Sequence, residues 1–363
     1  MPLLTPSFTP TSAQKNYLDT FMNKVSRSFA ILIPFLEEPL NHFLATSYLL
    51  CRVVDNIEDC QQPAAWKKLR FAEFSQLLKD PTLAADILAL WQQQAWPGLT
   101  PDEQELMGFQ HGLPLWQIYQ RIPAEPRQII DHWTATMARG MSQLEDPHQS
   151  PQFIQRQGVQ VLAAEEDYNR YCYYVAGTVG HLSTELVINH YRLNNTVAVG
   201  LLADCEACGR GLQKTNIIKD FAKDLRRGIS YLPDAWLREV NYTPLALAGA
   251  SPGWVKKVLQ NVVHELRDAT AYLLSLPYSA PGYRMASLLC LLPAYQTLLL
   301  AAEQQEKLFT SQHQVKISHL TMSRCVLDAR SMVKDNEAIG RYSRQLEQAI
   351  DATFRVPIGL PEP

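Results

Sequence analysis

The sequence has little charge of either sign and no long run of basic residues. Its 33 Lys and Arg residues and 36 Asp and Glu residues give a formal net charge of −3, and charged residues make up 19% of the chain. Nucleic-acid-binding proteins carry a basic patch or stripe, so this class is excluded. Hydrophobic residues make up 47% of the chain, which is too large a share for an intrinsically disordered protein.

Cysteine is also sparse. Seven cysteines are too few for a disulfide scaffold in a chain of 363 residues, and reduced cytosolic thiols are the simpler interpretation. The 16 Gly and 23 Pro residues are close to the average share, which excludes collagen-like and low-complexity chains. The N-terminus lacks the basic start and apolar core of a secretory signal, and the C-terminus has no apolar anchor. We therefore expect a cytoplasmic protein, either free or peripheral to a membrane.

One long uncharged segment is present. Residues 285–302 contain no charged residue and approach the length of a membrane span. Ser287, Pro293, Tyr295 and Gln296 interrupt the segment. These interruptions favour a buried central helix of a large soluble bundle over a membrane span.

Helical periodicity dominates the sequence, whereas strand-like alternation is sparse. Apolar residues recur at spacings of three and four in long segments that prolines separate. These segments are 38–59, 64–79, 126–144, 165–191, 196–227, 253–275, 283–309 and 318–350. We expect one all-α domain over residues 16–352, a helical bundle with a central cavity. Prolines keep residues 1–15 extended, and residues 353–363 form a C-terminal tail without a membrane anchor.

A first acidic motif ends one of the predicted helices. Asp55 and Asp59 are four residues apart, so both carboxylates face the same side of the helix. Glu58 flanks that face. Arg52 lies one turn before Asp55, and Tyr48 lies one turn before Arg52.

In a second motif, Asn216, Asp220 and Asp224 follow one another at four-residue spacing, with Gln213 one turn upstream. Mg²⁺ prefers oxygen ligands and is usually held by one or two carboxylates plus substrate phosphates. Two such motifs would hold a diphosphate through bridging Mg²⁺ and polarise it as a leaving group beside an apolar interior. Acid pairs at this spacing are also common on solvated helix faces, so the spacing leaves both interpretations open.

The residues around the two motifs resemble the squalene and phytoene synthase family. Four motifs carry the resemblance, and they follow the family's order over about residues 20–350. They are residues 26–30 with 48–59, residues 171–180, residues 212–220 and residues 231–233. Within the family, the Leu-Gln-Lys-Thr-Asn form and the Tyr-Cys-x-Tyr-Val-Ala-Gly form are closer to the squalene-forming members than to the phytoene-forming members.

The resemblance implies an isoprenoid-synthase fold and a Mg²⁺-dependent prenyltransferase, a farnesyl-diphosphate farnesyltransferase. The implied reaction joins two farnesyl diphosphates head to head to presqualene diphosphate and reduces this intermediate with NADPH to squalene. A synthase that stops earlier or omits the reduction is an alternative, and its product would be phytoene, dehydrosqualene or presqualene diphosphate. A non-catalytic isoprenoid-binding homologue is a further alternative.

The resemblance also implies roles for residues of this chain. The implied catalytic residues are Tyr171, Asp55, Asp59, Asp220 and Asp224. The implied metal ligands are Asp55, Glu58, Asp59, Asn216, Asp220 and Asp224. The implied substrate-binding residues are Ser26, Arg27, Ser28, Tyr48, Arg52, Gln213, Asn216 and Arg227, and Lys316 is implied to bind NADPH. Tyr171 matches a tyrosine that the family links to proton removal; because a phenol is a weak base, the departing diphosphate is the alternative proton acceptor.

Three positions depart from the family's pattern. Lys223 stands where an acid usually precedes the last Asp of the second motif, and Ile229 stands where an Arg is usual. Arg226 and Arg227 are close enough in sequence to substitute for that Arg. Of a basic loop that looks NADPH-related in eukaryotic members, Lys316 alone is retained. These departures bear on metal affinity at the second motif and on the use of a reductant.

Overall fold

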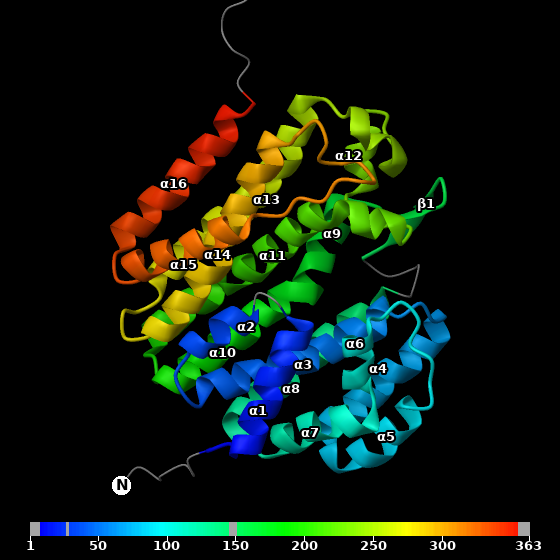
Figure 1. The fold of residues 1–363 in the computed structure, drawn as a ribbon, viewed down its shortest axis with the longest axis vertical. Coiled ribbons are helices and arrows are strands. Elements are labelled where there is room, and N and C mark those ends of the chain that lie inside the picture. Colours follow the sequence, from blue (N-terminus) through cyan, green and yellow to red (C-terminus); the bar gives the residue numbers. More distant parts are fainter. Residues whose placement is uncertain (1–7, 27–28, 145–150, 355–363) are drawn as a thin grey trace, which may run out of the picture. The chain divides into compact units, whose positions relative to one another are not determined.

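The computed structural model describes residues 8–26, 29–144 and 151–354. Helices make up most of these residues, so the prediction of a helical fold is confirmed (Figure 1). The chain forms two compact units, the first from residues 1–149 and 177–203 and the second from residues 150–176 and 204–363. Both units draw on residues 16–352, and the single synthase domain expected there stays a prediction.

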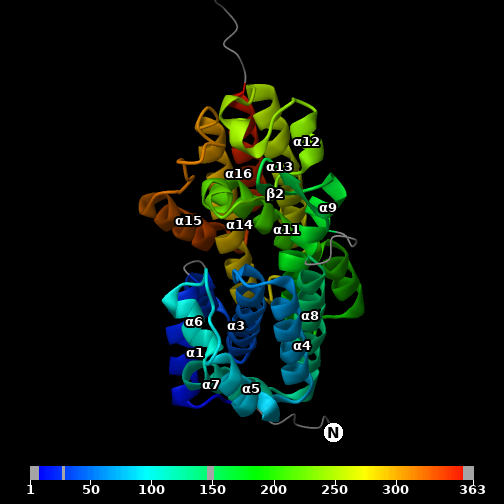
Figure 2. The same cartoon turned by 90° about the vertical axis from the view of Figure 1, so that its right-hand side faces the viewer.

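The first unit is built from helices, most of which contact α3. Their bounds are α1 Ser12–Val25, α2 Phe29–Leu32, α3 Leu40–Asp59, α4 Ala64–Lys79, α5 Ala84–Trp91, α6 Pro101–Met107, α7 Phe109–Gln120, α8 Ala124–Gln143 and α10 Thr178–Tyr191, with 3₁₀ turns at Ile33–Phe35 and Pro81–Leu83. α3 contacts α1, α4 and α8 (Figure 2). α8 also contacts α10. α11, Asn195–Arg226, begins in this unit and continues into the second.

The second unit combines helices with a small sheet. Its helices are α9 Glu165–Cys172, most of α11, α12 Asp234–Arg238, α13 Pro252–Ser275, α14 Pro281–Glu303, α15 His319–Met332 and α16 Asn336–Ala352, with a 3₁₀ helix at Pro244–Gly249. The strands are β1 Phe153–Arg156, β2 Val159–Leu162 and β3 Ile229–Ser230. β2 pairs antiparallel with β1 and parallel with β3. The sheet therefore joins the start of this unit to the segment that follows α11.

α14 contains the long uncharged segment. Within the described part of the chain it is the one helix with the length and hydropathy of a membrane span. Buried residues make up 67% of its most apolar window, and α13, α15 and α16 pack against it. It occupies the core position that its interrupting polar residues predicted.

Several predicted bounds differ from the structure. The helix expected over 318–350 is two helices, because Asp335 accepts a hydrogen bond from the N–H of Ala338 (2.9 Å) and starts α16. A π-helical turn, Tyr173–Gly177, interrupts the helix expected over 165–191. The helix expected over 283–309 ends at Glu303, and turns follow it.

The expected extended segment at residues 1–15 is also too long. α1 begins at Ser12, because the Thr11 side chain accepts from the N–H of Gln14 while the Gln14 side chain accepts from the N–H of Thr11. This reciprocal pair satisfies two donors at the helix start and outweighs the effect of the prolines that precede it.

Candidate active site

The first acidic motif lies at the C-terminal end of α3. Asp55 and Asp59 are half-buried, and α3 ends where Cys60 donates its N–H to the carbonyl oxygen of Asn56 (3.2 Å). The C-terminal end of a helix carries the negative end of the helix dipole, which disfavours carboxylates. Within this helix, the last turn contains no basic residue that would offset them. A cation bound at the two carboxylates would offset this unfavourable interaction.

Arg52 contacts Asp55 from one turn earlier. Nη1 of Arg52 lies 3.5 Å from Oδ2 of Asp55, and its Nη2 donates to the hydroxyl oxygen of Tyr48 (3.0 Å). The Tyr48 hydroxyl donates in turn to the carbonyl oxygen of Val25 (3.5 Å), and its ring lies 4.8 Å from that of Phe29. Tyr48 thus holds the guanidinium toward the acidic end of α3.

Two polar atoms of this group are buried without a hydrogen-bond partner among the described residues, namely Nε of Arg52 and Oδ1 of Asp55. Burial raises the pKa of Asp55 to about 6; the attraction of Arg52 opposes this shift, and the negative charges of Asp59 and Glu103 add to it. A buried carboxylate oxygen without a donor fits a Mg²⁺ ligand, and a buried guanidinium nitrogen fits a phosphate oxygen. The residues present therefore fit a metal-bound diphosphate.

Asn56, between the two carboxylates, faces the interior. It is buried, and its Nδ2 donates to the carbonyl oxygen of Glu103 (3.2 Å) and lies 3.5 Å from the sulfur of Met107. Both partners belong to α6. This amide fixes α3 against α6 and with it the orientation of the acidic end.

The remaining predicted residues of the first unit differ in their surroundings. Ser26 is buried, and its Oγ accepts from the N–H of Phe29 (3.0 Å), so it caps the start of α2. Glu58 is half-buried, as Asp55 and Asp59 are. Arg27 and Ser28 lie outside the described residues.

The second acidic motif lies on α11, in the second unit. Asn216 is exposed, and Asp220 and Asp224 are half-buried. Nζ of Lys219 donates to Oδ1 of Asn216 (3.0 Å) and lies 3.3 Å from Oδ2 of Asp220. The ammonium group of Lys219 therefore lies between two of the three oxygen-bearing side chains of the motif. A metal ion held by this motif would occupy a similar position between their oxygen atoms.

The segment between α14 and α15 lies against this motif. Gln314 donates Nε2 to Oδ1 of Asp220 (3.0 Å), and Arg226 donates Nη1 to the carbonyl oxygen of Ser311 (2.9 Å). Lys316, two residues after Gln314, is exposed. The structure therefore brings the segment of Lys316 beside the second motif. The sequence did not predict this proximity, because a single Gln in a turn-rich segment carries no recognisable pattern.

The positions that depart from the family's pattern lie near the end of α11. Lys223 is exposed, and Gln213 and Arg227 are half-buried. Ile229 is half-buried in β3, where it pairs with Gln160 of β2. An apolar residue at this position therefore forms part of the small sheet.

Tyr171 lies in an aromatic cluster. It is buried at the end of α9, its ring is stacked on that of Tyr231 (4.5 Å between centroids, 20° between planes), and the Phe153 ring meets it edge-on at 6.3 Å. A π-helical turn begins two residues later, at Tyr173, and such turns occur often at functional sites. Tyr231 belongs to a motif that the sequence singled out, but its contact with Tyr171 was not predicted.

In residues 8–26, 29–144 and 151–354, no group of three or more His, Cys, Asp and Glu side chains is arranged to hold a metal ion. Each motif offers few carboxylates, which suits Mg²⁺ when substrate phosphates and water supply the other ligands.

Comparison with known proteins identifies the family. The sequence pattern of the squalene/phytoene synthase family matches residues 22–321. Squalene synthase ERG9 of Candida albicans is 27% identical over 322 residues, covering 86% of this chain and 66% of that protein. Squalene synthase of Eremothecium gossypii is 27% identical over 362 residues, covering 96% of this chain and 75% of that protein. The chain thus spans about two thirds to three quarters of the length of these relatives.

Solved structures show the same fold. The complex of TcSQS with the ligand BPH1237 superposes with a TM-score of 0.74 at 21% identity, covering 94% of this chain and 99% of that one. A dehydrosqualene synthase in complex with a ligand superposes with a TM-score of 0.60 at 15% identity, covering 89% and 97%. The chain belongs to the squalene/phytoene synthase family.

Proposed function

We propose that this chain is a Mg²⁺-dependent squalene synthase. It joins two farnesyl diphosphates head to head to presqualene diphosphate and reduces this intermediate with NADPH to squalene. The observation that carries the proposal is the pair of oxygen-ligand motifs, residues 55–59 at the end of α3 and residues 216–224 on α11, in a chain of this family. The curated relatives named squalene synthase support the choice of product.

In the first unit, Asp55 and Asp59 would hold Mg²⁺ on one diphosphate, with Glu58 at the edge of the site. Bound Mg²⁺ neutralises the diphosphate and makes it a better leaving group. Arg52, held by Tyr48, would donate to a diphosphate oxygen through its Nε, which has no hydrogen-bond partner among the described residues. The other substrate-binding residues of the proposal are Ser26, Arg27, Ser28, Gln213 and Arg227.

In the second unit, Asn216, Asp220 and Asp224 would hold Mg²⁺ on the other diphosphate. Lys219, which contacts two of them, would move aside and turn to the phosphate oxygens. Tyr171 would orient the proton transfer that closes the cyclopropane ring. The ring of Tyr171 is stacked on that of Tyr231, and this contact supports a fixed orientation of the Tyr171 hydroxyl.

Fewer observations support the proposed use of NADPH as the reductant. Bound NADPH would supply the hydride for the reduction of presqualene diphosphate to squalene. Lys316 is exposed on a segment that contacts the second acidic motif through Gln314 and Asp220, so its ammonium is available to a phosphate of NADPH. Lys316 is the residue we propose for this role.

Product analysis tests the activity. Purified protein is incubated with farnesyl diphosphate and Mg²⁺, with and without NADPH, and again with geranylgeranyl diphosphate, and the products are identified by gas chromatography and mass spectrometry. Squalene that appears only with NADPH supports the proposal. Dehydrosqualene or presqualene diphosphate regardless of NADPH, or phytoene from the longer substrate, assigns the chain to the alternative synthases. Absence of any product favours a non-catalytic isoprenoid-binding homologue.

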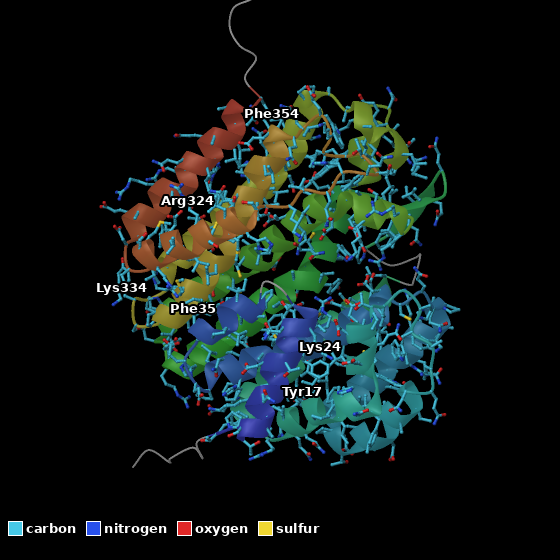
Figure 3. All side chains as sticks on the ribbon, in the orientation of Figure 1. Tyr17, Lys24, Phe35, Arg324, Lys334 and Phe354 are labelled. Carbon is cyan, nitrogen blue, oxygen red and sulfur yellow. The ribbon has the colours of Figure 1, made fainter. Side chains whose placement is uncertain are left out.

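We also propose that the protein works in the cytoplasm at the surface of a membrane, since squalene is a hydrocarbon that must leave into lipid. α15 supports this. Leu320 and Leu327 lie two turns apart on one face of α15, and they are 81% and 63% exposed. Arg324 lies between them, and Lys334 follows α15 (Figure 3). An exposed helix face that combines leucines with basic residues suits an anionic lipid surface.

Vesicle flotation tests the α15 face. The protein should float with phosphatidylcholine vesicles that contain anionic phosphatidylglycerol, and less with phosphatidylcholine alone. Leu320→Ser with Leu327→Ser should abolish flotation, whereas Leu90→Ser, at a leucine of α5 that is 54% exposed, should not. Flotation that survives the double substitution, or a dimer that the double substitution disrupts, would contradict the lipid assignment.

A further inference from the structure

A lysine is buried in the second unit, on the helix that carries the second acidic motif. Lys214 is 1% exposed, and its Nζ donates to Oε1 of Glu265 (2.8 Å) and to Oδ1 of Asn261 (2.9 Å), both on α13. The same ammonium lies 5.0 Å from the centre of the Tyr168 ring on α9. Two neighbouring helices therefore contact one ammonium group of α11.

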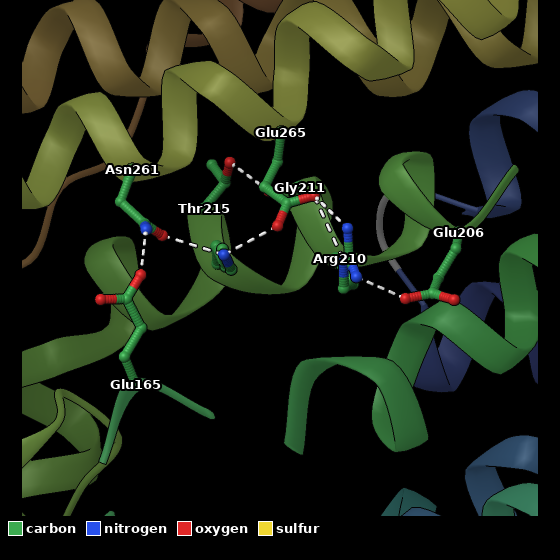
Figure 4. Close-up of polar contacts among 8 residues, drawn as sticks. Glu165, Glu206, Arg210, Gly211, Thr215, Asn261 and Glu265 are labelled. Carbon is green, nitrogen blue, oxygen red and sulfur yellow. Dashed lines mark hydrogen bonds and ion pairs between the residues drawn. The ribbon is translucent and has the colours of Figure 1, made fainter. Parts of the chain in front are cut away.

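These contacts extend into a chain of alternating charges (Figure 4). Glu265 accepts at Oε2 from Nε of Arg210 (3.2 Å), and Arg210 also pairs with Glu206 (2.5 Å). At the other end, Asn261 donates Nδ2 to Oε1 of Glu165 (3.1 Å). One polar network thus joins α9, α11 and α13.

α11 and α13 also approach closely one turn before Lys214. A Cβ atom on Gly211 would lie 2.9 Å from Cδ2 of Leu266 on α13, closer than such atoms come in proteins. Thr215 donates its hydroxyl to the carbonyl oxygen of Gly211 (2.8 Å) and so keeps its polar atom on α11. α11 and α13 are therefore in close contact at Gly211, one turn before the charged network that joins them.

Stability alone does not account for this network. Taking charges out of water costs several kcal/mol per ion, and well-packed apolar residues often give equal or greater stability than a buried ion pair. A buried ion pair can instead select one arrangement among similar ones. Lys214 reaches both Glu265 and Asn261 in one orientation of α11, whereas an apolar contact would tolerate several.

The rotation of α11 decides where the second acidic motif faces. Lys214 and Asn216 are two residues apart, about 200° around a helix, so they lie on opposite sides of α11. Lys214 is buried against α13, and Asn216 is exposed. We propose that Lys214 and Glu265 are positioning residues that fix the rotation of α11 and thereby align Asn216, Asp220 and Asp224 for a metal-bound diphosphate. The inference rests on the proposed function in one respect, the binding of diphosphate by this motif.

The test replaces the buried ion pair by apolar residues of similar length, Lys214→Met with Glu265→Met in one chain. Thermal unfolding reports stability, and calorimetry measures the binding of inorganic diphosphate in the presence of Mg²⁺. All proteins in this comparison also carry Asp55→Asn, so that binding at the second motif dominates the signal. We expect the thermal midpoint to change little, because apolar packing replaces the ion pair. We expect diphosphate binding to weaken at least about tenfold, because a small misplacement of ligands is costly.

A control variant removes a different ion pair of α13, one that joins this helix to α16 rather than to α11. Lys256 on α13 pairs with Asp351 on α16 (2.5 Å), and both side chains are half-exposed. Lys256→Met with Asp351→Met should leave diphosphate binding at the wild-type level. Loss of binding in the control as well would show a general effect of loosening α13 and would overturn the inference.

Unchanged diphosphate binding in the Lys214→Met, Glu265→Met double variant would also overturn the inference that this ion pair positions α11. If that variant does not fold, Lys214→Met alone decides, because methionine cannot donate to Glu265 or Asn261 while Glu265 keeps its contact with Arg210. Folded protein with weaker binding supports the inference, and unchanged binding contradicts it. The assay needs no turnover. A wild-type protein that binds diphosphate but makes no isoprenoid product would refute the proposed activity and leave this inference standing.

Discussion

Arg156 and Asp234 form a two-pronged ion pair between β1 and the first turn of α12. Nε and Nη2 of Arg156 donate to Oδ1 and Oδ2 of Asp234 at 2.6 and 2.7 Å. Asp234 is buried and also accepts from Nε of Arg238 (2.6 Å). Parallel hydrogen bonds between a guanidinium and a carboxylate are stronger than neutral ones, so this pair holds the sheet to the helix that follows it.

Asp234→Asn should destabilise the protein by about 1–3 kcal/mol at neutral pH. The hydrogen bond from Arg156 is the main reason that the pKa of Asp234 lies below its usual value. A lowered pKa stabilises the fold above the unfolded-state value of about 4, and this contribution is lost as the pH falls through the folded-state pKa. Urea unfolding at several pH values should therefore show a constant deficit for the variant at pH 5–7 and a shrinking deficit below about pH 4. A deficit independent of pH would contradict this account.

Arg284 is a buried cation bonded to the ends of helices. Its Nη1 donates to the carbonyl oxygens of Leu273 (3.1 Å) and Leu276 (2.5 Å) at the end of α13, and its Nε donates to that of Val333 (2.8 Å) after α15. Arg284→Leu would leave three carbonyl oxygens without this donor and should cost more than about 3 kcal/mol. Arg324→Leu, at an exposed arginine, should change the free energy of unfolding by less than about 0.5 kcal/mol. Urea unfolding of both variants is the measurement.

Replacement of glycine by alanine should have opposite effects on stability at Gly112 and at Gly200. A Cβ on Gly112 in α7 would lie 2.6 Å from the carbonyl oxygen of Leu106, so Gly112→Ala should destabilise by about 1–3 kcal/mol. Gly200 in α11 is exposed, and a Cβ there would meet nothing within 4 Å. Gly200→Ala should stabilise by up to about 1 kcal/mol, since alanine favours the helix. Equal shifts in thermal midpoint for the two variants would contradict the packing argument.

Most long helices were predictable because their apolar periodicity is strong. α3, α4, α11 and α13 begin and end within two residues of the predicted bounds. The short helices were not predicted, although α6 carries a local signal: Thr100 and Glu103 cap its start reciprocally, and Pro101 occupies its first position. The last predicted helix divides where Asp335 caps α16, and Arg284, a residue distant in sequence, donates to the carbonyl oxygen of Val333 in the same break. Periodicity does not report such contacts.

The candidate site was predictable where its residues share one helix. The carboxylates of α3 and the oxygen-bearing side chains of α11 follow from helical spacing. Contacts between separate segments did not follow, as for Tyr171 with Tyr231, Gln314 with Asp220, or the ion pair of Lys214 with Glu265. Within the motif that contains Lys214, the sequence drew attention to the oxygen-bearing residues and gave no sign that the lysine beside them is buried.

Asp55→Asn tests the first acidic motif. The amide cannot neutralise Mg²⁺, and loss of metal-assisted departure of diphosphate should lower turnover of farnesyl diphosphate by roughly 10²–10³-fold. Asp86→Asn, at an exposed aspartate of α5, is the matched control and should retain full turnover. Steady-state kinetics at saturating Mg²⁺ measure both. Full activity of Asp55→Asn would remove Asp55 from the site.

Lys316→Ala separates the two halves of the proposed reaction. Lys316 is exposed, so its loss should not change the thermal midpoint. A hydrogen bond from a charged group is worth about 1.5–3 kcal/mol, so the KM for NADPH should rise about tenfold or more. Formation of presqualene diphosphate, which uses no reductant, should proceed at the wild-type rate, and the intermediate should accumulate when NADPH is limiting. Lys307→Ala, at an exposed lysine of the turns after α14, should change neither quantity. An unchanged KM for NADPH in Lys316→Ala would place the cofactor elsewhere, and a slower first half-reaction would assign Lys316 to diphosphate binding instead.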